Sequence, residues 1–203
     1  MNKHLLIRQV EEFAKRHSVD YDAGHDWWHL HRVRNLALYL MTAVGSGDPF
    51  IIEIAALLHD IDDKKFAEKR FSATEEKIDP FLKSLEVESG TISEVLFINK
   101  NISFSNEIKP DGPSVEFRIV QDADRLDAIG AIGVARAFNY GGFRNNSIYD
   151  PENDSPSTIR HFYDKLLKLA GLMNTDAAKE IATKRHEFLE LFLKQFYREW
   201  ELR

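Results

Sequence analysis

Apolar residues recur at spacings of three and four along most of this chain, which is the period of an amphipathic helix. Leu6, Val10 and Phe13 show it first, and they predict a helix over residues 3–17. Further segments combine the same period with helix start and stop signals. They predict helices over about 26–43, 49–60, 72 onwards with an interruption at Pro80, 91–99, 114–139, 155–171 and 175–201. No stretch shows the alternation of a β-strand, so the chain is expected to be all-α.

The segment over 49–60 differs from the others because it is apolar on every side except at Glu53. It opens with Asp48-Pro49, in which the aspartate suits the N-cap and the proline suits the first helical position. A helix with no polar face is expected to be buried at the centre of a bundle. Its apolar run ends abruptly in a histidine and an aspartate, His59-Asp60.

The segment over 143–157 is polar and rich in turn-forming residues, and it separates two predicted helices. A loop of this length can be a mobile lid over a site or a plain connection, and the sequence leaves both open. No internal repeat, low-complexity segment or linker divides the chain. One domain over residues 1–203 is therefore expected.

The composition is that of a globular domain, and it excludes several classes of protein. Hydrophobic residues make up 43% of the 203 residues and there is no cysteine, which excludes disulfides and thiolate metal sites. No run approaches the roughly 20 apolar residues of a membrane span, and the first residues do not have the pattern of a signal peptide. A cytoplasmic protein with no membrane partner is therefore expected. The net charge of −6 argues against duplex nucleic acid but allows a phosphorylated small molecule, because a metal can supply positive charge.

The pair His59-Asp60 is a candidate half of a metal site. Neutral imidazole and carboxylate are both metal ligands, and a buried charge needs a partner or a metal. Neighbouring residues in the middle of a helix point about 100° apart, but at a helix C-terminus both side chains can bend towards one ion. The alternative is a histidine that interacts favourably with the helix dipole, followed by an aspartate in a turn.

A second cluster of histidines lies at the predicted start of the helix over 26–43. His25 and His29 are four positions apart and share a face, and His29 stands where the polar start meets the apolar stripe. That boundary suits a buried ligand, although a hydrogen-bonded histidine at a helix start is the alternative. Arg32, one turn after His29, is expected to be structural and to pair with a carboxylate.

A third cluster places three acids, Asp122, Asp124 and Asp127, in an otherwise apolar helix. Ionised carboxylates are almost never fully buried without a partner, so a solvated face is a poor explanation. Asp124 and Asp127 share a face and Asp122 lies on another. A metal ion or an arginine such as Arg32 or Arg125 explains the pattern better.

Taken together, the three segments give a histidine, a His-Asp pair and a distant helical aspartate. This order resembles the signature H…HD…D of the HD-domain phosphohydrolase superfamily, an all-α family, over roughly residues 20–130. The resemblance implies a single-domain helical bundle of the HD type, on which the helices over 155–201 pack. It maps the metal ligands onto His29, His59, Asp60 and Asp124. The sequence around these motifs is similar to that of a small bacterial branch of the superfamily, which includes manganese-dependent nucleotide pyrophosphohydrolases.

Two imidazoles and two carboxylates suit one divalent first-row metal ion: manganese by the branch resemblance, with nickel, cobalt, iron or zinc as alternatives. The implied reaction converts (deoxy)nucleoside triphosphates to monophosphate and pyrophosphate. The alternatives are a phosphomonoesterase or phosphodiesterase acting on another nucleotide, and a non-catalytic metal-containing module that binds a ligand. A homo-oligomer is left open.

The resemblance also implies roles around the metal. An acid one turn after Asp60 often orients the attacking water in related enzymes, which indicates Asp63, with Asp62 as its competitor. The predicted substrate-binding residues are Lys64 and His25. The predicted supporting residues around the ligands are Asp26, Arg32, Arg125 and Asp127.

Overall fold

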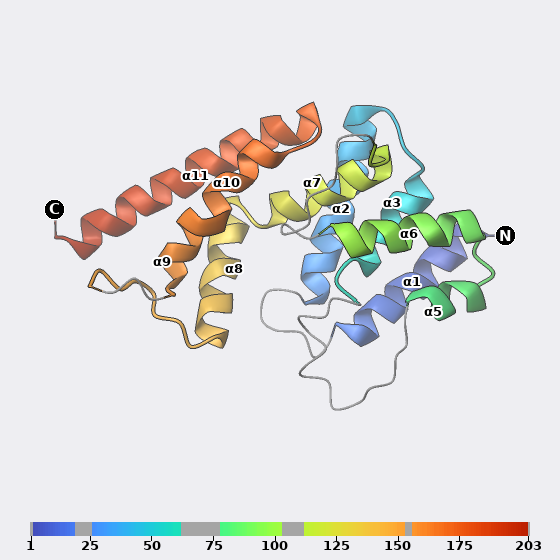
Figure 1. The fold of residues 1–203 in the computed structure, drawn as a ribbon, viewed down its shortest axis with the longest axis horizontal. Helices are drawn as coiled ribbons and strands as arrows, with labels where there is room; N and C mark the ends of the chain where they lie inside the picture. The colour runs from blue at the N-terminus through green and yellow to red at the C-terminus, as the bar shows by residue number, and fades with distance from the viewer. Residues whose placement is uncertain (1, 19–25, 62–77, 103–111, 153–155, 203) are drawn as a thin grey trace. The chain divides into compact units, whose positions relative to one another are not determined.

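The computed structural model describes residues 2–18, 26–61, 78–102, 112–152 and 156–202, and this part of the chain is all-α (Figure 1). The only extended pairing within it is an isolated bridge between Ser147 and Ser157. The predicted fold class is confirmed. None of the described helices is both long and apolar enough to cross a membrane. The helices form two compact units, which meet in the sequence between Gln121 and Asp122.

The first unit is built around helix α3, which packs against α1, α2 and α6. Its helices are α1 (Lys3–His17), α2 (Trp27–Val44), α3 (Pro49–Leu58), α5 (Ile78–Ser84), α6 (Ser89–Asn101) and the first half of α7 (Val115–Asp127). Nearly every residue of α3 is buried, as its apolar sequence predicts. The helix ends at Leu58, so His59 and Asp60 lie in the turn that follows it rather than inside the helix.

Side-chain caps explain where the two helices nearest to the candidate site begin. Asp26 is the N-cap of α2, and its Oδ1 accepts from the backbone N–H of His29 at 3.0 Å. Asp48 caps α3 in the same way, accepting from the backbone N–H of Phe50 at 2.7 Å. The Asp48 cap and the start of α2 near Asp26 were therefore predicted correctly, whereas the capping role of Asp26 was not predicted.

The second unit is organised around α11 (Asp176–Trp200), which packs against α8 (Gly130–Phe143) and α10 (Leu167–Leu169). Figure 1 shows α11 as the longest helix drawn, with α10 running beside it. The predicted helix over 155–171 begins at Thr158 after the N-cap Ser157. It consists of α9 (Thr158–His161), a π-helical segment (Phe162–Leu166), α10 and a 3₁₀ turn (Ala170–Leu172).

The prediction of one long helix over 114–139 is wrong, because the chain breaks between α7 and α8. Ile129 is extended and Gly130 has φ 76°, a left-handed conformation that glycine adopts without strain. A Cβ at Gly130 would also lie 3.0 Å from Cγ of Arg185 on α11. The continuous apolar period therefore concealed a turn that depends on this glycine.

The described part of the segment over 143–157 is anchored within the second unit. The backbone N–H groups of Thr158 and Ile159 donate to the carbonyls of Ser147 and Ile148, at 2.9 and 3.0 Å. The ring of Tyr149 meets three aromatic rings of α11 edge-on, those of Phe196, Tyr197 and Trp200. This anchoring favours the plain connection over the lid.

Candidate metal centre

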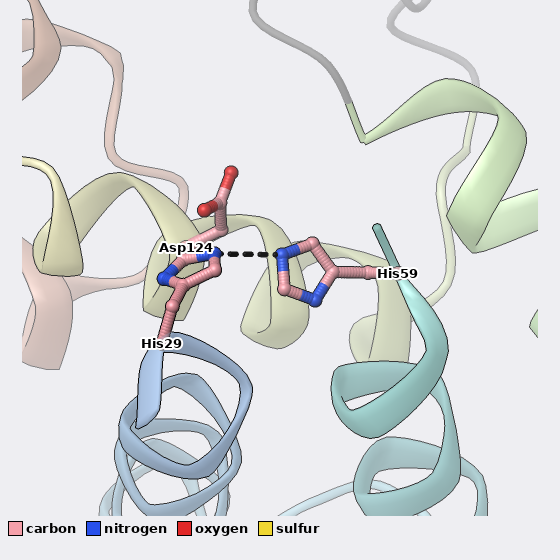
Figure 2. A group of neighbouring side chains, drawn as sticks. All are labelled: His29, His59 and Asp124. Carbon is pink, nitrogen blue, oxygen red and sulfur yellow. Dashed lines mark hydrogen bonds between the residues drawn. The ribbon is translucent and has the colours of Figure 1, made fainter. Parts of the chain in front are cut away.

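Two buried histidines, one from α2 and one from the turn after α3, face each other in the first unit (Figure 2). His29 comes from the first turn of α2 and is 0% exposed, and His59 follows the last residue of α3 and is 3% exposed. Their Nε2 atoms are 3.2 Å apart. The sequence separates the two residues by 30 positions, and the packing of α2 against α3 brings them together.

Hydrogen bonds to the backbone hold both histidines in place. Nδ1 of His59 donates to the carbonyl oxygen of Ala56 at 2.8 Å, so Nε2 of the neutral ring carries the lone pair. His29 is fixed at its backbone by the Asp26 cap. A histidine whose far nitrogen donates to a carbonyl is the usual arrangement for a metal ligand, because that bond sets the tautomer and the ring orientation.

Asp60 brings a carboxylate to the same point. Its Oδ2 lies 3.3 Å from Nε2 of His29 and 3.6 Å from Nε2 of His59. The residue is buried, so water does little to screen these groups from one another. The sequence prediction that both side chains of the His59-Asp60 pair can turn towards one centre agrees with this geometry.

Asp124 supplies the third member of a group that could hold a metal ion. His29, His59 and Asp124 each offer one ligand atom, and these atoms lie within 4.8 Å of one another. Figure 2 shows the carboxylate of Asp124 beside the two rings. Asp124 stands on α7 and is half-buried.

The chemistry of this donor set fits a divalent metal. Burying two imidazoles beside carboxylates is unfavourable unless positive charge is shared among them. Imidazole and carboxylate ligands together suit first-row ions such as manganese, iron, cobalt, nickel and zinc. The residues that would hold such an ion are His29, His59 and Asp124, with the carboxylate of Asp60 within reach of the same point.

The other two acids of the α7 cluster are held by protein groups instead. Asp122 is 0% exposed, and its carboxylate accepts four hydrogen bonds of 2.8–2.9 Å from the backbones and side chains of Asn174 and Thr175. Asp127 pairs with Arg136 at 2.8 Å. A metal or an arginine was predicted for these acids, and the peptide, amide and hydroxyl donors at Asp122 were not expected.

The predicted supporting residues differ in their contacts and burial. Arg125 donates to the carbonyl oxygen of Leu172, and burial lowers the pKa of its guanidinium while Asp122 and Asp124 oppose that shift. Asp26 acts on the backbone of His29 through the helix cap. Arg32 is half-buried on α2.

His25, Asp62, Asp63 and Lys64 lie outside the described residues. Their predicted roles therefore stay predictions.

The contacts of two polar residues of the first unit were not predicted from the sequence. Arg34 on α2 donates to Glu53, which was noticed only as the polar exception in an apolar helix. Asn99 on α6 donates from Nδ2 to the carbonyl oxygen of Leu58 at 3.2 Å, immediately before the His-Asp pair. The available signal was an amide that directly follows Ile98 in a helix whose buried residues are all apolar.

A model of the HD domain family matches residues 27–129, the range that contains His29, His59, Asp60 and Asp124. The chain belongs to the HD domain family. It is 38% identical over 189 residues to the protein YpgQ of Bacillus subtilis, covering 92% of this chain and 90% of YpgQ. The sequence-based assignment to the HD superfamily is thereby confirmed.

Solved structures of HD proteins agree over the whole chain. A structure of an HD-superfamily hydrolase from Bacillus thuringiensis is 41% identical, covers 100% of both chains and has a TM-score of 0.79. YpgQ has been crystallised in complex with ADP, and that structure is 36% identical with a TM-score of 0.78, over 95% of this chain and 97% of its own. This HD protein therefore has the fold of HD-superfamily hydrolases.

Proposed function

We propose that this HD protein is a metal-dependent phosphohydrolase that converts (deoxy)nucleoside triphosphates to monophosphate and pyrophosphate. The observation that carries the proposal is the convergence of His29, His59 and Asp124 within 4.8 Å, with Asp60 Oδ2 at 3.3 Å from His29. We assign these four residues as the ligands of one divalent ion, manganese by resemblance. A single domain over residues 1–203 and a cytoplasmic location remain part of the proposal.

The choice of a nucleotide rests on a relative. YpgQ, which aligns with nearly the whole of this chain, was crystallised with ADP. The ADP complex of this relative supports a nucleotide as the ligand of this HD protein. The net charge of −6 requires local positive charge to hold phosphates, and the metal and nearby cations would supply it.

The described side chains supply binding and orientation. When bound, a divalent ion provides Lewis-acid chemistry by lowering the pKa of a water molecule and polarising a phosphate oxygen. His59 holds its lone pair towards the centre because Ala56 fixes its other nitrogen. Phosphoryl and nucleotidyl transfer need little covalent help from the protein, so positioning and charge are sufficient.

Three further residues complete the proposed site from outside the described residues. Asp63 orients the attacking water, Lys64 contacts a substrate phosphate, and His25 contacts the substrate. Attack at the α-phosphorus would expel pyrophosphate, a good leaving group. Only one cluster of histidines and acids that could hold a metal is found among the described residues, which supports a single catalytic ion.

The test starts from protein stripped of metal and reloaded separately with manganese, nickel, cobalt, zinc or magnesium. Each form is assayed on a panel of nucleotides in oxygen-18 water, and the products are analysed by mass spectrometry. Label in the nucleoside monophosphate, with pyrophosphate released, is the expected result. Label in pyrophosphate, or orthophosphate as the first product, would contradict it and favour a phosphatase. No turnover with any metal would favour a module that only binds its ligand.

A further inference from the structure

Helix α3 ends beside the histidine–aspartate pair, and its last carbonyl groups need donors from outside the helix. The carbonyl oxygen of Ala56 accepts a hydrogen bond from Nδ1 of His59 at 2.8 Å. The carbonyl oxygen of Leu58 accepts a hydrogen bond from the backbone N–H of Ile61 at 3.0 Å. It also accepts a hydrogen bond from Nδ2 of Asn99 at 3.2 Å. Asn99 is the only one of these three donors that lies on another helix.

Asn99 stands on α6, which packs directly against α3. It follows Ile92 and Val95 at helical spacing, on the side of α6 where buried apolar residues lie. The position therefore favours an apolar side chain on packing grounds. An amide here is unexpected unless its hydrogen bond to Leu58 has a use.

The other half of the amide strengthens this argument. Oδ1 of Asn99 is inaccessible to solvent and accepts no hydrogen bond from the described residues. Burying an acceptor in this way is unfavourable. A leucine at this position would avoid that loss, so a packing role alone does not explain the asparagine.

We propose that Asn99 is a positioning residue for the metal site, an inference that rests on the proposed function of that site. By holding the Leu58 carbonyl, it fixes the turn over residues 59–61, which carries His59 and Asp60. That turn directs Nε2 of His59 towards Nε2 of His29 at 3.2 Å (Figure 2). Asn99 acts through the backbone and touches neither metal nor substrate.

The test compares Asn99→Leu with a matched control, Asn101→Leu. Asn101 is on the same helix, and its Nδ2 donates to the carbonyl oxygen of Phe97 in that helix at 2.8 Å. Nitrogen-15 NMR of the histidine rings in metal-free protein reports the tautomer and environment of His59. Competition with a chelator then gives the manganese affinity, measured well below the melting temperature of each variant.

Asn99→Leu is expected to change the His59 ring signals and to weaken manganese binding about tenfold, as loss of an outer hydrogen-bond partner typically does, while Asn101→Leu changes binding less than about twofold. Wild-type ring signals and affinity in Asn99→Leu would overturn the inference. If Asn99→Leu does not fold, Asn99→Asp carries the same expectations, because it keeps the size and loses the donor. If the wild type binds no metal, the proposed function fails, and the His59 signals still decide the role of Asn99.

Discussion

Asp60 and Asp122 are both buried aspartates, one in each compact unit, and their surroundings differ. The carboxylate of Asp122 accepts four hydrogen bonds from Asn174 and Thr175, two at each oxygen. One oxygen of Asp60 instead lies 3.3–3.6 Å from the Nε2 atoms of His29 and His59. Peptide, amide and hydroxyl donors hold the carboxylate of Asp122, whereas the carboxylate of Asp60 lies beside two imidazoles that could hold a cation together with it.

The difference separates two reasons for burying charge. A carboxylate whose lone pairs are occupied by peptide and hydroxyl donors stabilises the fold and has little capacity left for a ligand. Imidazoles and carboxylates that converge on one point can instead hold an ion, and the free energy of ion binding then adds to the stability of the fold. Changes at Asp122 are therefore expected to affect stability, and changes at the histidine pair are expected to affect ion binding.

Asp122→Ala should have the largest effect on stability. It leaves four donors without their acceptor in the interior of the second unit, and breaking a buried charged network from one side costs about 3–5 kcal/mol. Urea denaturation followed by circular dichroism measures the loss. Asp176→Ala is the control, because Asp176 lies at the start of α11 with its carboxylate in solvent, and its midpoint should stay close to that of the wild type. A similar loss in both variants would remove the distinction.

Metal addition should stabilise the protein through the histidine pair alone. An ion at a concentration 100 times its Kd adds about 2.7 kcal/mol to the free energy of unfolding. Thermal melts with manganese and with chelator should therefore differ for the wild type and coincide for His59→Ala. An equal metal-induced shift in His59→Ala would place the ion elsewhere.

Glu53→Gln sharpens the comparison inside the first unit. Oε1 of Glu53 accepts hydrogen bonds from Nε and Nη2 of Arg34, so a protein group balances the charge of this carboxylate. Losing its charge should lower the free energy of unfolding by about 2 kcal/mol, within the range for hydrogen bonds to charged groups. Manganese affinity should not change. The control is Glu12→Gln, an exposed neighbour of Lys15 on α1.

The substitution His161→Asn should have the smallest effect, a change in how stability depends on pH. Burial, and then Lys165, lower the pKa of this histidine in the second unit, while Asp164 opposes them. The unfolded chain therefore binds a proton more readily, and stability falls as the pH drops below the ordinary histidine pKa of about 6.5. His161→Asn should remove less than about 1 kcal/mol of the loss between pH 7 and pH 5, since part of the ring is exposed. Identical denaturation profiles against pH would contradict this.

The fold class and most helix positions followed from the sequence because the helices carry caps and apolar faces that can be recognised locally. Asp48-Pro49 and Thr175 start their helices where the sequence predicted. The break at Gly130 was missed because the apolar period continues through it. A left-handed glycine is recognisable only when its packing partner, Arg185, is known.

The candidate ligands could be selected from the sequence because imidazoles and carboxylates are rare in apolar helices. The partners of Asp122 could not, since Asn174 and Thr175 lie more than 50 residues away and neither carries a charge. Asn99 was missed for a similar reason. A single amide in a helix gives no local sign that it reaches a backbone carbonyl 41 residues earlier.

The hydrogen bonds of Asp122 also have a consequence during synthesis on the ribosome. The first of their donors, Asn174, is translated 52 residues after the aspartate, which corresponds to a delay of about 3–10 s at ordinary elongation rates. Until then, the half of α7 that carries Asp124 lacks the donors that satisfy Asp122. The proposed ligand Asp124 therefore stands on a part of α7 whose neighbouring aspartate gains its hydrogen bonds only late in synthesis.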